Sequence, residues 1–169
     1  MRYFSGFCLK EESELFDEFT CKSDFSVCGF SYGAIKAFEY TLRCKERIDK
    51  LQLFSPAFFM DKDEKFKKLQ TLYFKKDSNA YCNNFLENVT YPSNVVIKNY
   101  FSRGSLEELK ELLYYNWNEE DLKILSERGV EIEVYLGELD KIIESHHGKD
   151  FFQPYSTIYT IKNVGHILK

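Results

Sequence analysis

Short apolar segments alternate along the chain with longer segments whose apolar residues recur at helical spacing. The short segments predict five β-strands, over residues 2–4, 25–29, 50–54, 130–137 and 157–162. Apolar residues three and four positions apart predict helices over residues 11–19, 32–47, 105–113 and 118–129, and a short helix up to Gly148. Strands that alternate with helices favour an α/β fold with a mostly parallel sheet and right-handed crossovers.

Residues 58–118 differ in character from the rest of the chain. They are helical by pattern, rich in aromatic residues, and contain six lysines against four acidic residues between positions 61 and 77. Ser105 with Glu108 predicts a capping box at one helix start, and Asn118 with Asp121 predicts a cap for the next. We therefore expect one domain, with a core of residues 1–57 and 119–169 and a helical lid of residues 58–118 inserted before the penultimate strand.

The fourth predicted strand alternates apolar residues with Glu131 and Glu133. A parallel sheet covered on both faces reads instead as a continuous apolar run. The pattern predicts a sheet with one thinly covered face, and a homodimer that buries this face is a hypothesis. Alternatively, the glutamates lie near the end or edge of the strand.

A G-x-S-x-G sequence at residues 29–33 separates the second predicted strand from the helix that follows. This is the pattern of a nucleophile elbow, a sharp turn that exposes one side chain at the end of a sheet. Ser31 would lie at the tip, and the backbone N–H of Tyr32 would face a developing oxyanion at the start of the helix. The plainer alternative is a strand-to-helix turn with a serine cap.

Ser31, Asp140 and His166 follow the second, fourth and fifth predicted strands. In this order and placement they resemble the nucleophile, acid and base of the α/β-hydrolases. The resemblance implies that His166 takes the proton of Ser31 and that Asp140 orients the imidazole ring. It also implies a second backbone donor to the oxyanion from the loop after the first strand, which here is Phe7. The family has a histidine where this chain has Ser5, and a larger sheet than five strands.

Other residues near these positions offer alternatives. His146 or His147 could replace the base, and Glu138 or Glu144 could replace the acid. A metal site built from the two adjacent histidines and nearby acids has no second ligand cluster to support it. We expect neither a metal nor a cofactor.

Composition limits the remaining possibilities. The net charge is −4, which argues against nucleic-acid binding. The five scattered cysteines form no C-x-x-C pair, which is typical of free thiols in a reducing cytoplasm. We expect no signal peptide at the start, and no apolar run reaches the length of a membrane span.

The small size, the F-S-G-F start, the C-G-F-S-Y-G elbow and the basic insertion together resemble the compact pimeloyl-acyl carrier protein methyl ester esterases of biotin synthesis. The resemblance implies an acidic carrier protein as partner, which a basic patch would attract. Four lysines of the insertion are candidates for this contact: Lys65, Lys68, Lys75 and Lys76. Another small esterase or thioesterase acting on short acyl esters is the alternative, and a hydrolase-shaped binding protein is a third.

Overall fold

Five parallel strands form one sheet in the computed structural model, which describes residues 1–169. The strands lie in chain order: β1 Arg2–Phe4, β2 Ser26–Phe30, β3 Lys50–Phe54, β4 Glu131–Gly137 and β5 Thr157–Ile161. The five predicted strands and their parallel arrangement are confirmed. Since all strands point the same way, the loops that follow them gather at one end of the sheet.

The helices are η1 Glu12–Phe16, α1 Tyr32–Arg43, α2 Glu64–Lys76, α3 Ser78–Thr90, η2 Lys98–Tyr100, α4 Leu106–Tyr114, α5 Glu119–Glu127 and α6 Ser145–Phe152. The prediction of a helix over residues 11–19 was wrong, because the structure has only a five-residue 3₁₀ helix there, η1, in which Glu12 is buried. α1 ends earlier than predicted, since Cys44 is already extended. α6 continues past Gly148, which is buried within the helix.

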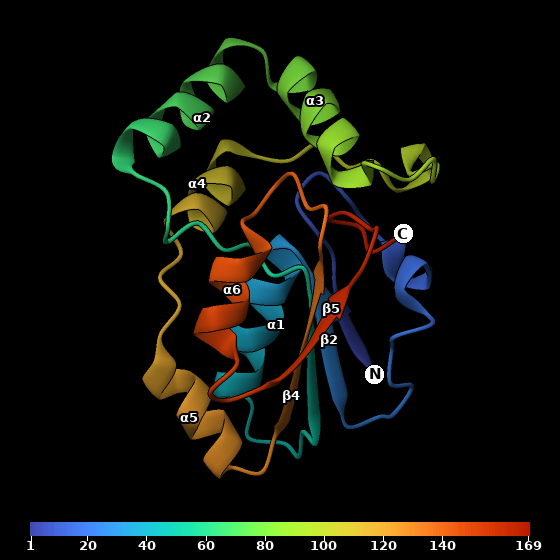
Figure 1. The fold of residues 1–169 in the computed structure, drawn as a ribbon, viewed down its shortest axis with the longest axis vertical. Coiled ribbons are helices and arrows are strands. Elements are labelled where there is room, and N and C mark those ends of the chain that lie inside the picture. Colours follow the sequence, from blue (N-terminus) through green and yellow to red (C-terminus); the bar gives the residue numbers. More distant parts are fainter.

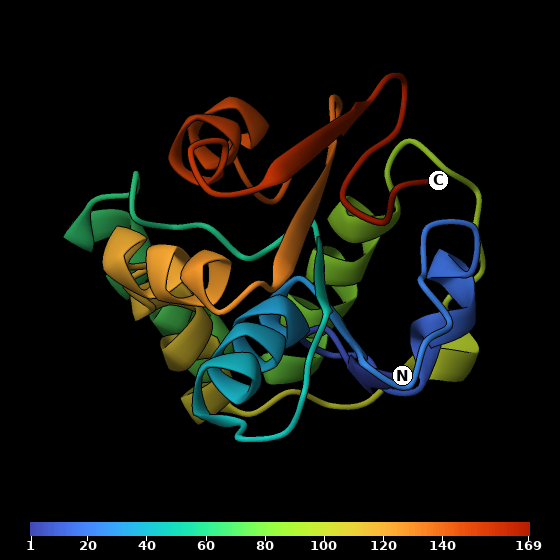
Figure 2. The ribbon, with the colours of Figure 1, turned by 90° about the horizontal axis from the view of Figure 1, so that it is seen from below.

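Helices cover the two faces of the sheet unequally (Figure 2). α1, α5 and α6 lie on one side, whereas η1 and the C-terminal residues lie on the other. The larger apolar core contains 27 buried residues, among them Phe38, Val134 and Trp117, and the smaller contains 10, among them Phe16 and Phe54. The second face is therefore covered by a thin layer of mostly irregular chain.

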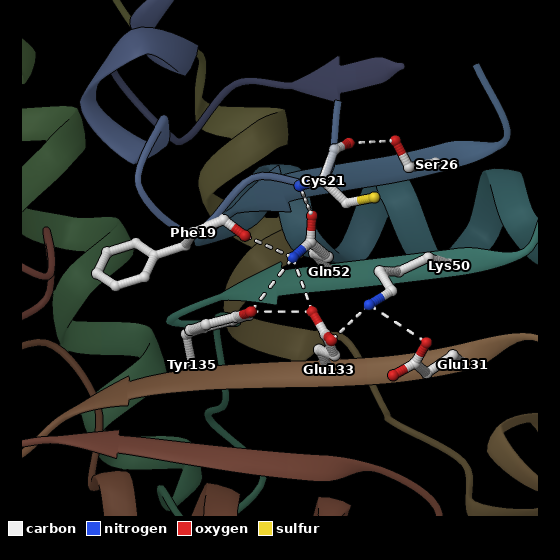
Figure 3. Close-up of polar contacts among 8 residues, drawn as sticks. All are labelled: Phe19, Cys21, Ser26, Lys50, Gln52, Glu131, Glu133 and Tyr135. Carbon is white, nitrogen blue, oxygen red and sulfur yellow. Dashed lines mark hydrogen bonds and ion pairs between the residues drawn. The ribbon is translucent and has the colours of Figure 1, made fainter. Parts of the chain in front are cut away.

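The glutamates of β4 differ in their surroundings (Figure 3). Glu131, the first residue of the strand, is exposed. Glu133 is only 5% exposed, because β4 is an interior strand. Its carboxylate accepts hydrogen bonds from Lys50 (2.6 Å), Gln52 (2.7 Å) and Tyr135 (2.9 Å). Glu131 lies at the end of the strand, as the alternative proposed, but the sequence did not show that Glu133 is buried and satisfied by a polar network.

Of the segment between β3 and β4, α2, α3 and α4 lie at the end of the molecule where the carboxyl ends of the strands lie, whereas α5 lies at the opposite end (Figure 1). Asp63 and Asp77 cap α2 and α3, and the predicted capping box of Ser105 is present at α4. Asn118 caps α5 through the N–H of Glu120 rather than with Asp121. No helix is long and apolar enough to cross a membrane. That these helices move as a lid stays a prediction.

Candidate active site

The G-x-S-x-G turn joins β2 to α1, as predicted. Ser31 has φ 54° and ψ −114°, a backbone conformation that non-glycine residues rarely adopt. A Cβ atom on Gly29 would lie 2.2 Å from the carbonyl oxygen of Gly33, and one on Gly33 would lie 2.0 Å from that of Phe4. The two glycines therefore allow the close backbone approach that places Ser31 at the carboxyl end of β2.

Three predicted site residues meet at this turn. Nε2 of His166 lies 2.9 Å from Oγ of Ser31, and Nδ1 lies 2.6 Å from Oδ2 of Asp140. An ionised carboxylate only accepts hydrogen bonds, so Nδ1 carries the proton of the neutral ring and Nε2 accepts from the Ser31 hydroxyl. This arrangement can take the serine proton onto the imidazole while the carboxylate fixes the tautomer.

The loops after β4 and β5 fix the acid and the base. Oδ1 of Asp140 accepts the backbone N–H groups of Ile142 (2.7 Å) and Ile143 (3.0 Å), which leaves Oδ2 for the imidazole. The carbonyl of His166 accepts a hydrogen bond from the Ser55 hydroxyl, after β3, at 2.7 Å. The side chains of Asp140 and His166 are almost completely buried, at 1% and 0% exposure. Such burial strengthens the hydrogen bonds between them.

The first residue of α1, Tyr32, and the loop after β1, which contains Phe7, flank the elbow at the carboxyl ends of neighbouring strands. Both residues are buried. The Phe7 ring packs edge-on against Phe85 of α3, with ring centroids 5.3 Å apart. The two backbone N–H groups stay predictions as oxyanion donors. The loop before Phe7 approaches the elbow closely, since a Cβ atom on Gly33 would lie 2.5 Å from the carbonyl oxygen of Ser5.

Glu12 supports the loop after β1, and the sequence analysis missed it. Glu12 is fully buried. Its Oε1 accepts hydrogen bonds from the backbone N–H of Gly6 at 2.7 Å and from the Tyr3 hydroxyl at 2.9 Å. Oε2 is buried without a hydrogen-bond partner. Glu12 thus fixes the Ser5–Gly6 peptide, one peptide before the N–H of Phe7. A glutamate in an acidic helix start reads as a solvated residue, so nothing in the pattern pointed inward.

The side chain of Tyr32 connects the elbow to the inserted helices. Its hydroxyl donates to Glu111 of α4, and the ammonium group of Lys36 lies 4.2 Å from the centre of its ring. Burial, followed by this hydrogen bond and the charge of Glu111, raises the pKa of Tyr32 above its ordinary value. Tyr32 therefore stays a neutral donor and fastens α4 beside Ser31.

The alternative bases and acids lie away from Ser31. His146 and His147 are both exposed on α6, and Nδ1 of His147 lies 2.8 Å from Asp61. Glu138 and Glu144 are exposed too, and neither contacts His166. No group of three or more His, Cys, Asp or Glu side chains is arranged to hold a metal ion.

A mostly apolar cavity of about 220 Å³ lies among the inserted helices and the loop after β4. α2, α3 and α4 provide most of its wall: Phe66, Gln70, Tyr81, Asn84, Phe85, Asn88, Leu109, Leu112 and Leu113. The wall also contains Ile142, whose N–H binds Asp140, and Phe85, whose ring touches Phe7. The cavity is thus separated from the Ser31–His166 pair by residues that contact the site directly.

The four candidate lysines are exposed on α2, and none of them pairs with a carboxylate. At 100° per residue, Lys65, Lys68, Lys75 and Lys76 lie on one side of the helix. Glu64 is the only acidic residue of α2. The structure therefore groups these lysines as one basic surface, whereas the sequence alone showed only how many charges the segment contains.

No family model and no curated protein matches the sequence. Solved structures do match, and the esterase EaEST from Exiguobacterium antarcticum has a TM-score of 0.68 at 15% identity over 91% of this chain and 63% of that one. The naproxen esterase (carboxylesterase NP) of Bacillus subtilis has a TM-score of 0.57 at 22% identity, over 92% and 57% of the two chains. MenH from S. aureus has a TM-score of 0.59 at 15% identity, over 97% and 85%.

The parallel sheet and the elbow after β2, together with these matches, define an α/β-hydrolase fold, as the sequence resemblance implied. The chain spans 54% of one matched Bacillus subtilis structure and 57% of the naproxen esterase. Identities below 25% establish the fold alone, and the evidence for an activity lies in the site.

Proposed function

We propose that the protein is a serine carboxylesterase. Ser31 attacks the ester carbonyl, and His166 accepts the hydroxyl proton while Asp140 holds the ring. The backbone N–H groups of Phe7 and Tyr32 stabilise the oxyanion, and each donor is worth about 3–4 kcal/mol of barrier. His166 then protonates the departing alcohol, and water activated by the same ring releases the acid. The observation that carries this proposal is the hydrogen-bonded series Ser31–His166–Asp140.

We further propose that the substrate is the methyl ester of pimeloyl-acyl carrier protein, cleaved in biotin synthesis. The cavity wall supports an aliphatic acyl chain, since eight of its twelve residues are hydrophobic. Ile142 contacts Asp140 and Phe85 contacts Phe7, so two residues of this wall also touch the site, which supports an acyl chain that runs from the site into the cavity. A short free ester would leave most of the apolar wall unfilled and would gain less binding energy.

The basic surface of α2 supports a carrier protein as the partner. Acyl carrier proteins are acidic, and this chain is itself acidic overall, so attraction must come from a local patch. Lys65, Lys68, Lys75 and Lys76 provide four exposed positive charges without internal partners. The association rate should therefore fall as salt screens the lysines, over a Debye length of about 8–10 Å near physiological ionic strength.

Substrate access requires motion of the inserted helices. Ser31 is only 3% exposed and His166 is fully buried. α3 contacts the histidine loop, because the N–H of Ile167 donates to the carbonyl of Val89 at 3.2 Å. Residues 58–118 therefore act as a lid in this proposal, and its opening precedes ester binding.

The test measures methanol release from methyl pimeloyl-acyl carrier protein by the wild type, by Ser31→Ala and by a lysine-reversed variant. Ser31→Ala should lose turnover by a factor of at least about 10³. Lys65→Glu/Lys68→Glu should lower kcat/KM on the carrier-bound ester and leave cleavage of free p-nitrophenyl butyrate unchanged. Lys45→Glu/Lys162→Glu, with the same charge change on exposed, unpaired residues outside α2, is the matched control.

The outcomes separate the candidate functions. Ser31-dependent cleavage of p-nitrophenyl butyrate without turnover of the carrier-bound ester would keep the esterase and discard the biotin role, leaving a small esterase or thioesterase. Binding of the carrier without any hydrolysis would favour the hydrolase-shaped binding protein. Equal salt sensitivity of the lysine variant and its control would remove α2 as the docking surface.

A further inference from the structure

Two cysteines far apart in the sequence face each other between the loop after β1 and α3. The Sγ atoms of Cys8 and Cys82 lie 2.8 Å apart, and the residues are 3% and 0% exposed. All five cysteines are free thiols, and the sulfurs of Cys28 and Cys44 contact oxygen atoms instead. The close pairing of Cys8 and Cys82 was not predicted from the sequence.

The backbone on both sides of the pair is well fixed. Cys8 has φ 61°, its carbonyl accepts from Ser102 at 3.0 Å, and the next residue, Leu9, bridges to Phe101. Cys82 lies within the 13-residue helix α3. A disulfide has an S–S length of about 2.05 Å, so the sulfurs need to approach each other by roughly 0.8 Å.

The surroundings make the two thiols chemically unequal. The hydrogen bond from the Cys8 thiol lowers the pKa of Cys82 to about 7, and the N–H of Gly104 and the charge of Arg103 act in the same direction against burial. The pKa of Cys8 is raised, because this thiol donates the hydrogen bond and is buried. Cys82 is therefore the more nucleophilic sulfur at neutral pH, and Cys8 is the proton-bearing neighbour.

We propose that Cys8 and Cys82 form a redox-active pair that closes to a reversible disulfide when a peroxide is present. The Cys82 thiolate attacks one peroxide oxygen and hydroxide leaves, which yields a sulfenic acid. The sulfur of Cys8 then attacks the sulfenic sulfur, its proton is lost, and water leaves. Two thiols give up two electrons and two protons, and one hydrogen peroxide becomes two molecules of water.

The bond would fasten α3 to the loop that carries Phe7. α3 provides Tyr81, Asn84, Phe85 and Asn88 to the cavity wall. The disulfide therefore restricts outward movement of this wall and of the helix that covers the histidine loop. This effect on substrate access rests on the proposed function, whereas formation of the bond does not.

Peptide mapping tests the bond in the unmodified protein. Trypsin cleaves after Lys and Arg and places every cysteine in a different peptide, with Cys8 in residues 3–10 and Cys82 in residues 77–98. After hydrogen peroxide treatment of the folded protein and alkylation of free thiols, we expect these two peptides to be joined. Their combined mass should be about 2 Da below the sum of the reduced peptides, and dithiothreitol should separate them.

Thermal unfolding tests the tether. Oxidation should raise the Tm of the wild type by about 4 °C or more, since a disulfide typically contributes a few kcal/mol. Cys82→Ser should show neither the joined peptide nor the rise, whereas Cys44→Ser, the matched control, should show both. Recovery of the two cysteines as unmodified thiols, as separate sulfinic or sulfonic acids, or joined to other cysteines would overturn the proposal. So would a joined pair with a lower Tm. Each of these results is independent of ester hydrolysis.

Discussion

Glu12→Ala is the sharpest test of how the loop after β1 is held. The change leaves the buried N–H of Gly6 without an acceptor and removes one acceptor from the half-buried Tyr3 hydroxyl. An orphaned buried donor costs about 1–3 kcal/mol, and we expect a total loss of about 2–4 kcal/mol because two donors are affected. At about 2–4 °C per kcal/mol for a chain of this size, the Tm should fall by about 4–16 °C.

The same change should also lower activity, because Gly6 directly precedes Phe7. A displaced Phe7 N–H weakens one oxyanion contact, and complete loss of such a donor costs about 10²–10³ in kcat. We expect a fall in kcat below this limit, with KM changed little, in p-nitrophenyl ester cleavage. Glu12→Gln keeps an oxygen at the Oε1 position, so it should retain more stability and more activity than Glu12→Ala.

Glu107→Ala is the control, since it removes an exposed glutamate of α4 that makes no hydrogen bond or ion pair. Urea unfolding gives the free energy for all three variants, and circular dichroism gives the Tm. If Glu12→Ala matches the control in Tm within about 1 °C and in kcat, Glu12 does not hold the loop, and our account of the loop after β1 is refuted.

Three further results are expected. Asp140→Asn should lower kcat by about three to four orders of magnitude, because the amide favours the wrong tautomer of His166, while the free energy of unfolding changes little. A fall in kcat of less than about tenfold in steady-state kinetics would contradict this. Gly33→Ala should unfold at lower urea than the wild type, since its Cβ would meet the Phe4 carbonyl, whereas Gly148→Ala, whose Cβ would lie 4.0 Å from the Leu136 side chain, should be neutral or stabilising. Burial raises the pKa of Glu133, but the hydrogen bonds from Lys50, Tyr135 and Gln52 outweigh it, so the pKa is lower in the folded protein. The ionised Glu133 therefore stabilises the fold above about pH 4.5, and this stabilisation is lost as pH falls through the lower folded pKa. The Tm difference between the wild type and Glu133→Gln should shrink on acidification, and a constant difference would contradict this.

The strands were predicted well, because short apolar runs bounded by turns are typical of buried strands and too short for helices. β3 and β4 combine strand-forming residues with turns at both ends, and parallel order follows from the helices between them. Helix ends were predicted less well. Gly148 suggested a stop, but α6 continues to Phe152, whose buried ring packs against Trp117 with ring centroids 4.9 Å apart. Tertiary contacts thus outweighed local helix signals.

The Ser31, Asp140 and His166 constellation was predictable because chain order and strand ends fix where such residues meet. Glu12 and the Cys8–Cys82 pair were not predictable. Each depends on a contact between two segments of the chain, and the pattern of apolar residues does not show how such segments lie relative to each other. The basic surface of α2 lies between these cases, since the helix was predicted from a pattern but the direction in which its lysines face was not.

The thin face of the sheet and the active-site loop belong to one hydrogen-bonded structure. Gln52 bonds Glu133 on β4, and it also donates to the carbonyl of Phe19 at 2.8 Å and accepts from the N–H of Cys21 at 2.7 Å (Figure 3). These contacts hold the chain that follows η1 against the sheet, in place of a covering helix. η1 in turn carries Glu12, which fixes the Ser5–Gly6 peptide of the loop that contains Phe7. A polar residue in an interior strand is costly unless every partner is supplied, and here the partners also position the segment that supports the site.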